Sequence, residues 1–361
     1  MGVNGAWAFL QYNDIKGTRR DRLGSFKFEE KIYVDVVGTF YDILKKHFWL
    51  CDDEDNEGSL AIAAKRSLYE ISTIINKHKY ILCIDGERTL ERRKGHQQRL
   101  QLKLNTQANI SNALDKFLDK RIKKKGDCNK LMYLSKKLFR FSENATKAFV
   151  QLCRKTGWEV MIGDGEAEVA VGRLGGIVVT QDSDLLFYPK IKVVIKPLNE
   201  GGYVLYEKDD ILSVLGITNE VWTTLGILAD NDYDSDNFLP KGLYNSDRHR
   251  KTLYADQFED NYNRMLECLD TIVNKTIPVT TAELVQEYIQ AFLTLMNKQE
   301  VKEIQFDAYR NSYRIFVLQK EEITKDEHML NKLITLEPRH IIKKILDSDA
   351  EWKPNYLLKS L

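Results

Sequence analysis

Four short segments in the first half of the chain are rich in apolar residues and are closely followed by acidic ones. They lie at residues 32–34, 80–84, 159–162 and 177–179, and β-branched or aromatic side chains make up at least half of each. Short runs of this kind predict buried strands. Because the strands of a parallel sheet end at the same edge, the acids that follow them should converge there. The pattern therefore constrains the chain to an α/β fold with a negatively charged sheet edge.

Two pairs of acids stand out, Glu166 with Glu168 and Asp182 with Asp184, each separated by two positions. A single Asp at a strand end is commonly a turn former or a helix N-cap, but two such pairs are improbable as accidents of capping. Crowded carboxylates repel one another, and hard divalent cations relieve that repulsion. We therefore expect two Mg²⁺ ions, or Mn²⁺ in their place, bound by the acids of this edge. Those acids are Asp35, Asp85, Glu166, Glu168, Asp182, Asp184 and Asp232.

Strand and helix patterns alternate along the first part of the chain, and this predicts a doubly wound, mainly parallel sheet. Predicted strands lie near residues 31–37, 80–84, 159–162, 176–180 and 191–195. Amphipathic helical patterns without strand signals follow Pro240, at residues 253–273, 282–296 and 328–346. We expect a core at residues 1–245 and a helical C-terminal region at residues 246–361.

The segment from Glu87 to Lys147 interrupts the alternation, because it is polar, helix-prone and much longer than an ordinary connection. We predict helices within it at residues 88–103, 114–125 and 131–141, with a break at residues 125–127. From Gly86 to Arg140 there are sixteen Lys and Arg against five Asp and Glu, a net charge of +11, although the whole chain carries only +1. A basic insertion beside an acidic metal site indicates a polyanionic substrate.

Several other classes of protein are excluded by simple counts. The five cysteines form no CxxC pair, which argues against a disulfide framework or a zinc site and fits a reducing compartment. No segment has the ~20 apolar residues of a membrane span, and the first residues lack the pattern of a signal peptide. Ala6 stands where a myristoylation motif requires Ser or Thr. We expect an intracellular protein, nuclear in a eukaryote, and a monomer.

Five segments of the sequence then support a resemblance to a known family. MGVNGAWAFL, IYVDVVGTFY, YILCIDGERTLERRKGHQQR, GDGEAEVAVGRLGGIVVTQDSDLL and LADNDY resemble, in order and spacing, the signature segments of the flap endonuclease and xeroderma group G superfamily of structure-specific 5' nucleases. The resemblance covers roughly residues 1 to 245. It implies that the seven acids bind two metal ions and that the basic insertion, at about residues 88–147, is the family's helical arch over a 5' single strand.

The resemblance also implies roles for individual basic, aromatic and glycine residues. Arg92 and Arg99 correspond to residues that point at the scissile phosphate, although the family commonly has Lys at the first position. Tyr41 corresponds to an aromatic residue that stacks on a nucleobase, and Gly2 to a glycine near the active site. Nucleic-acid contacts are further implied for Lys120, Arg121, Lys123, Lys124 and Lys125 in the arch, and for Lys241 and Gly242 in a hairpin that grips duplex.

The chain departs from the family pattern at the hairpin, where Tyr244 replaces a glycine and cannot offer the same close backbone approach. Val37, Gly38 and Ala229 depart as well, and the last six residues do not resemble a sliding-clamp peptide. The function implied is metal-dependent hydrolysis of DNA near junctions of single and double strand. Two alternatives stay open: a ribonuclease related to PIN domains, and a scaffold that binds RNA or protein without cutting.

Overall fold

The sheet of the computed structural model contains the five predicted strands together with two more. The structure describes residues 2–3, 5–51, 58–87, 89–90, 92–229, 231–233, 310–317 and 335–360. Its seven strands lie in the order β1-β7-β6-β5-β2-β3-β4. They are β1 (Thr18–Arg20), β2 (Ile32–Asp35), β3 (Tyr80–Ile84), β4 (Val160–Ile162), β5 (Gly176–Val179), β6 (Ile191–Pro197) and β7 (Tyr203–Glu207).

Parallel pairing is found in the middle of the sheet and antiparallel pairing at one edge. β2 pairs with β5 and β5 with β6 in parallel, whereas β7 runs antiparallel to both β6 and β1. The predicted α/β fold with a parallel sheet is therefore confirmed, with an antiparallel edge that the sequence patterns did not indicate. Buried strand residues explain the apolar runs, since Ile32 and Val34 of β2 and Leu82 and Cys83 of β3 have no exposed surface.

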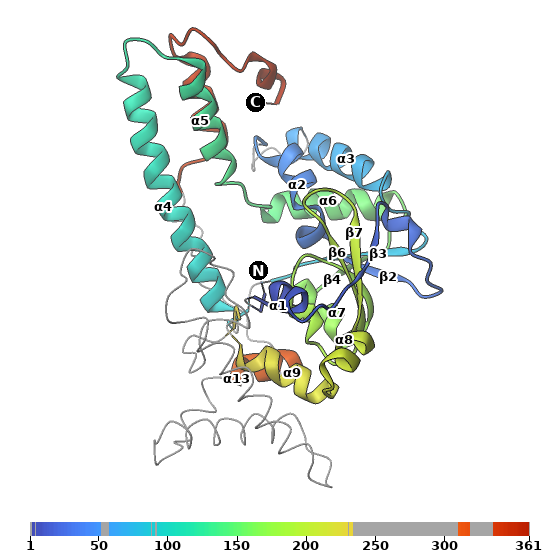
Figure 1. Cartoon of the computed structure of the whole chain (residues 1–361). Coiled ribbons are helices and arrows are strands. Elements are labelled where there is room, and N and C mark those ends of the chain that lie inside the picture. The colour runs from blue at the N-terminus through green and yellow to red at the C-terminus, as the bar shows by residue number, and fades with distance from the viewer. Residues whose placement is uncertain are drawn as a thin grey trace, which may run out of the picture. The chain divides into compact units, whose positions relative to one another are not determined.

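The described helices alternate with the strands over the first two thirds of the chain (Figure 1). The shorter ones are α1 (Ala6–Tyr12), α7 (Ala167–Leu174), α8 (Lys208–Leu215), α9 (Asn219–Leu228), α13 (Arg310–Val317) and α14 (Pro338–Asp347). The longer ones are α2 (Val36–Phe48), α3 (Ser59–Ser72), α4 (Arg93–Leu118), α5 (Lys125–Lys136) and α6 (Glu143–Lys155). Short 3-10 helices lie at Leu23–Ser25, Asp184–Leu186 and Asn355–Ser360. No described helix has the length and apolar character needed to cross a membrane.

The chain divides into two compact units. The first consists of Met1–Thr39, Cys83–Gly95 and Met161–Asp326, and the second of Phe40–Leu82, His96–Val160 and Glu327–Leu361. In the first unit, Trp222 of α9 is fully buried and stacks on Phe187 at 4.5 Å between ring centroids. The expected boundary at residue 245 stays a prediction, as do the helices at 253–273 and 282–296, because they lie outside the described residues.

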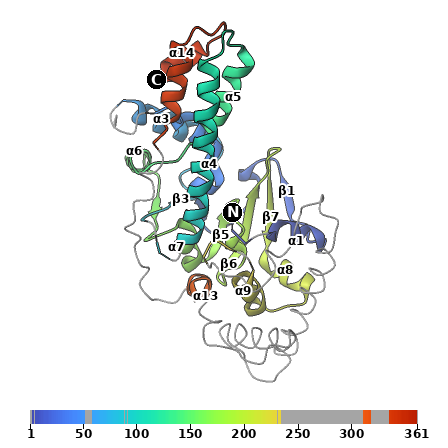
Figure 2. The same cartoon turned by 90° about the vertical axis from the view of Figure 1, so that its left-hand side faces the viewer.

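The second unit contains the basic insertion from His96 onward and the described residues 335–360. α14 packs on α5, and its Ile341, Ile342 and Ile345 have no exposed surface. Figure 2 shows α4, α5 and α14 as neighbouring helices. The carboxamide oxygen of Gln107 on α4 accepts hydrogen bonds of 2.9 Å from the amides of Thr335 and Leu336, just before α14. The insertion thus has two helices of its own, not the three predicted, and α5 begins at Lys125, where a break was expected.

Candidate metal centre

All seven predicted acids belong to the first unit, at the ends of its strands and helices. Asp35 is the last residue of β2, and Asp85 follows β3. Glu166 and Glu168 open α7, Asp182 and Asp184 follow β5, and Asp232 follows α9. The strand ends therefore bring acids from distant parts of the sequence into one unit, as a parallel sheet should.

A group of three carboxylates lies closest together. Single carboxylate oxygens of Glu168, Asp182 and Asp184 lie within 4.8 Å of one another, and all three side chains are buried. Among the described residues, neither carboxylate oxygen of Asp184 has a hydrogen-bond partner, although Asp184 has no exposed surface. Buried polar atoms without a partner are rare and costly, and they commonly mark an ion. Asp184, Glu168 and Asp182 thus fit a hard divalent cation, for which carboxylate oxygens are the preferred ligands.

The proton affinities of these carboxylates agree with a site built for a cation. Burial raises the pKa of Asp184 well above its ordinary value, and the charge of Asp182 raises it further, while Arg92 and the Val3 backbone oppose the rise. Burial likewise raises the pKa of Glu168 well above its ordinary value, although Arg92 opposes this. Burial thus disfavours the charged form of both carboxylates, and a bound divalent ion would favour it.

Arg92 is buried among the carboxylates. Its Nη1 donates hydrogen bonds of 2.8 Å to Glu166 Oε2 and to Glu168 Oε1, and its Nη2 donates one of 3.1 Å to Asp232 Oδ2. Asp182 Oδ2 lies 3.6 Å from Nη2. Burial disfavours the charge, but Glu168 and Glu166 outweigh it and raise the pKa of Arg92 well above its ordinary value. Arg92 therefore stays charged and crosslinks three of the segments that carry the acids.

Asp35 is held by two donors. Gly38 N and Thr180 Oγ1 each donate to its carboxylate at 2.9 Å. Burial raises the pKa of Asp35 to about 6, and these two hydrogen bonds limit the rise. A Cβ on Gly38 would stand 2.1 Å from Asp35 Oδ2, so any larger residue there would displace the Asp35 carboxylate. Thr180 was not among the predicted site residues, because a threonine after a strand carries no signal that distinguishes it from a strand residue.

Asp85 joins β3 to the start of α7. Its carboxylate accepts a hydrogen bond of 2.8 Å from the amide of Ala167, the first residue of α7, where helices have unpaired N–H groups. Burial raises the pKa of Asp85 to about 7, with Glu166 and Asp35 adding repulsion. The side chain of Asp85 is nevertheless open to solvent. Through its contact with Ala167, Asp85 positions the Glu166–Glu168 segment.

Gly2 lies against the Asp182–Asp184 segment. It has a φ of 96°, and an added Cβ would stand 2.1 Å from Asp182 Oδ1. Ser183 Oγ also donates to the carbonyl of Val3 at 3.0 Å. The structure therefore places Gly2 beside two of the predicted metal ligands, and both its backbone conformation and the lack of space require glycine.

Tyr233 and Asn231 flank Asp232 and fix its segment. The Tyr233 hydroxyl donates to Glu168 Oε1, and the ring lies 5.8 Å from the Arg92 guanidinium carbon. Asn231 Oδ1 accepts from the Tyr233 amide at 3.0 Å and from Ser312 Oγ at 2.9 Å. Both residues stand in the LADNDY segment of the sequence, so this segment was recognised, but the contact with Glu168 could not be foreseen from it.

The remaining predicted nucleic-acid residues belong to the second unit or lie outside the described residues. Arg99 is half-buried on α4. Tyr41 is 38% exposed, and its ring centroid lies 5.5 Å from that of Phe139. Lys45 Nζ lies 5.5 Å from the Tyr41 ring, so a basic group accompanies this exposed aromatic surface. The proposed hairpin residues Lys241 and Gly242 lie outside the described residues.

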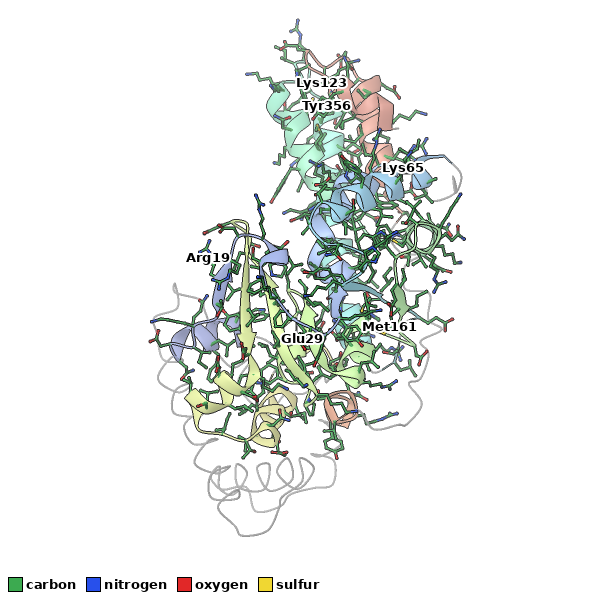
Figure 3. All side chains as sticks on the ribbon, turned by 90° about the vertical axis from the view of Figure 1, so that its right-hand side faces the viewer. Arg19, Glu29, Lys65, Lys123, Met161 and Tyr356 are labelled. Carbon is green, nitrogen blue, oxygen red and sulfur yellow. The ribbon has the colours of Figure 1, made fainter. Side chains whose placement is uncertain are left out.

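The basic run between α4 and α5 is less open to solvent than the sequence suggested. Lys123 is buried, and its Nζ lies 2.5 Å from Asp349 Oδ1. Figure 3 labels Lys123, which lies in the connection between α4 and α5. The ammonium group of Lys123 is therefore paired within the chain in this structure, and the phosphate contact expected of it stays a prediction. Lys120 pairs with Asp127 at 2.6 Å, and Lys125 Nζ lies 5.2 Å from the ring of Trp352. Arg121 and Lys124 are exposed.

No protein-family model and no curated protein matches the chain. Three similar solved structures are the catalytic core of Rad2 in complex with a DNA substrate, human GEN1 in complex with Holliday junction DNA, and flap endonuclease-1 from Methanococcus jannaschii. The first has 17% identity and a TM-score of 0.47, with 100% of both chains covered. The second has 17% identity and a TM-score of 0.42, with 100% of this chain and 76% of that chain covered. The third has 13% identity and a TM-score of 0.38, with 85% of this chain and 95% of that chain covered.

Proposed function

We propose that the protein is a divalent-metal-dependent nuclease that hydrolyses DNA phosphodiester bonds near junctions of single and double strand. The observation that carries this proposal is the buried Glu168–Asp182–Asp184 group, in which both oxygens of Asp184 are left without a hydrogen-bond partner among the described residues. An acidic cluster of this density is poorly explained as a structural feature, because burying carboxylates without partners destabilises a fold.

The chain's own residues supply distinct parts of the chemistry. Glu168, Asp182 and Asp184 would hold a metal ion, and Asp35 and Asp85 are kept in place by their hydrogen-bond donors. Bound divalent ions activate water and stabilise the departing oxygen in phosphodiester hydrolysis. Arg92 is permanently charged and can pair with phosphate through two N–H groups, so it is suited to neutralise charge that develops on the phosphate.

We infer that the substrate is DNA and that hydrolysis has 5' polarity from the resemblance of the five sequence segments. The net charge of +11 between Gly86 and Arg140 supports a polyanionic substrate but does not distinguish DNA from RNA. The exposed Tyr41 with its neighbour Lys45 is suited to contact a nucleobase and its phosphate. We further propose Mg²⁺ as the working ion and Mn²⁺ as a substitute.

Cleavage of end-labelled 5'-flap DNA, blunt duplex and single-stranded DNA and RNA tests this function. The purified protein is assayed with Mg²⁺ or EDTA beside two variants, Asp184→Asn in the cluster and Asp210→Asn on the exposed surface of α8. We expect metal-dependent cutting at the flap junction that is lost with Asp184→Asn and kept with Asp210→Asn. Binding of nucleic acid without cutting under every condition would indicate a scaffold that is not an enzyme. Cutting of RNA alone would indicate a ribonuclease.

A further inference from the structure

The Arg92 guanidinium occupies the carboxylate oxygens that a metal ion would need. Glu168 Oε1 accepts hydrogen bonds from both Arg92 Nη1 and the Tyr233 hydroxyl, so its lone pairs are already engaged. Asp182 Oδ2 lies 3.6 Å from Arg92 Nη2. Of the three ligands of the candidate site, Asp184 alone has both oxygens without a hydrogen-bond partner among the described residues. A cation that binds all three residues must therefore compete with Arg92.

The position of Arg92 also leaves one of its own donors unused. Its Nε is buried and has no hydrogen-bond partner among the described residues, whereas the two Nη groups carry all of its ion pairs with the acids. A guanidinium offers five N–H donors, and a buried donor without a partner costs free energy. This arrangement is electrostatically favourable without being fully satisfied, so another partner can draw the side chain away.

We propose that Arg92 is an internal counter-ion of the acidic cluster that competes with the metal for Glu168 and Asp182 and exchanges these carboxylates for a nucleic-acid phosphate. This inference rests on the proposed function and adds a regulation of the same site. Phosphate pairs with a guanidinium in the same bidentate manner as a carboxylate does. Departure of Arg92 to a phosphate frees carboxylate oxygens, so metal and nucleic acid should each tighten the binding of the other.

The substitution that tests this is Arg92→Gln, measured by Mn²⁺ binding without any nucleic acid. The free Mn²⁺ concentration is followed by electron paramagnetic resonance during titration of the protein. We expect Arg92→Gln to bind Mn²⁺ at least roughly fivefold more tightly than the wild type, the lower limit of ordinary coupling effects. Arg93→Gln is the matched control, because Arg93 is the next residue and is exposed, and its Mn²⁺ affinity should equal that of the wild type.

If the role of Arg92 were purely structural, the Mn²⁺ affinity of Arg92→Gln would change in the opposite direction. If Arg92 only holds the acids in position, its removal loosens the site and weakens Mn²⁺ binding, and that outcome overturns the proposal, as does an unchanged affinity. Absence of saturable Mn²⁺ binding in the wild type and in Arg92→Gln alike would overturn the metal-dependent function as well. Binding that is equal in the two proteins would overturn the counter-ion role alone.

Two further measurements keep the proposal testable if Arg92→Gln fails to fold. Arg92→Lys keeps the charge but cannot bridge two carboxylates from a planar fork, so its Mn²⁺ affinity should lie above that of the wild type. In the wild type itself, a hydrolysis-resistant phosphorothioate oligonucleotide should tighten Mn²⁺ binding, by the same factor by which Mn²⁺ tightens binding of the oligonucleotide. Independent binding of the two would contradict the exchange of partners by Arg92.

Discussion

The Thr180 hydroxyl joins two acids of the candidate site, since it donates to Asp35 Oδ2 at 2.9 Å and accepts from the Asp182 amide at 2.9 Å. Asp35 ends β2, whereas Thr180 and Asp182 follow β5, so one side chain connects the ends of two neighbouring strands. Such partners of metal ligands orient the ligand oxygens, and their loss commonly lowers metal affinity 10–100-fold.

Thr180→Val should therefore weaken Mn²⁺ binding by roughly tenfold or more, measured by calorimetric titration. The change keeps the shape of the side chain but removes the donor to Asp35. Thr223→Val is a matched control, because the Thr223 hydroxyl is equally buried and donates to the carbonyl of Phe187 at 2.9 Å. Thr180→Val removes two hydrogen bonds of a buried hydroxyl and Thr223→Val removes one, so both should lower the melting temperature. Equal Mn²⁺ affinity in the two variants would show that Thr180 does not position Asp35.

Gly38→Ala should also disturb the Asp35 carboxylate, by steric displacement and not by loss of a hydrogen bond. The new Cβ would stand 2.1 Å from Asp35 Oδ2 and 3.1 Å from Thr180 Oγ1, so Asp35 has to move. Overcrowding of this kind costs about 1–3 kcal/mol, and displacement of Asp35 should also reduce Mn²⁺ affinity. Gly24→Ala serves as the control, since a Cβ on Gly24 would meet no atom within 4 Å. Thermal denaturation with and without Mn²⁺ measures both effects, and a Gly38→Ala protein that behaves like Gly24→Ala would refute the prediction.

The sequence predicted the strands and the acids at their ends because both produce local patterns. β3, for example, is a run of five buried residues that stops at Asp85. Contacts between distant segments leave no such pattern, so neither Thr180 beside Asp35 nor Tyr233 beside Glu168 could be foreseen. Lys123 illustrates the same limit, because nothing in a basic run distinguishes the lysine that pairs with Asp349 from its exposed neighbours.

The start of α5 was missed for a local reason. Lys125-Gly126-Asp127 suggested a break, because glycine weakens helix interiors. The structure instead places these residues in the first turn of α5, where Asp127 Oδ2 accepts the Lys124 amide at 3.2 Å. An acid in the third position of a helix caps its N-terminus, and it is favoured by the helix dipole. The residues that were expected to interrupt a helix therefore begin one.

The metal-free protein should lose stability as the pH rises. Burial raises the pKa of Asp35 to about 6, from 3.8 in the unfolded chain, so between these values the folded state binds more protons than the unfolded one. The free energy of unfolding therefore falls through this range, by on the order of 3 kcal/mol for Asp35, and stays lower above it. The raised pKa values of Glu168 and Asp184 act in the same direction.

In EDTA, we accordingly expect a higher melting temperature at pH 5 than at pH 8, measured by differential scanning fluorimetry. Mn²⁺ should restore stability at pH 8, because a ligand that binds only the folded state stabilises it. Asp35→Asn, which has no carboxyl group to titrate, should show a smaller difference between the two pH values. A wild-type melting temperature that increases steadily from pH 5 to pH 8 in EDTA would show that titration of these buried carboxylates does not control the stability.

The basic run at residues 120–125, between α4 and α5, should contain both residues that stabilise the fold and residues that bind nucleic acid. Lys123 is buried against Asp349, whereas Arg121 is exposed two residues earlier. Arg121→Met should flatten the dependence of log K on log salt concentration for nucleic-acid binding, by up to about 0.9 for one duplex phosphate contact. Lys123→Met should leave this slope unchanged.

Asp349→Ala complements these two substitutions. Because it leaves the buried Lys123 ammonium without its carboxylate, it should destabilise the protein more than Lys123→Met does, although Asp349 is itself largely exposed. Fluorescence anisotropy at several salt concentrations measures the slopes, and thermal denaturation ranks the stabilities. A slope that falls as much with Lys123→Met as with Arg121→Met would mean that Lys123 leaves Asp349 to contact phosphate, and the phosphate contact predicted for Lys123 from the sequence would stand.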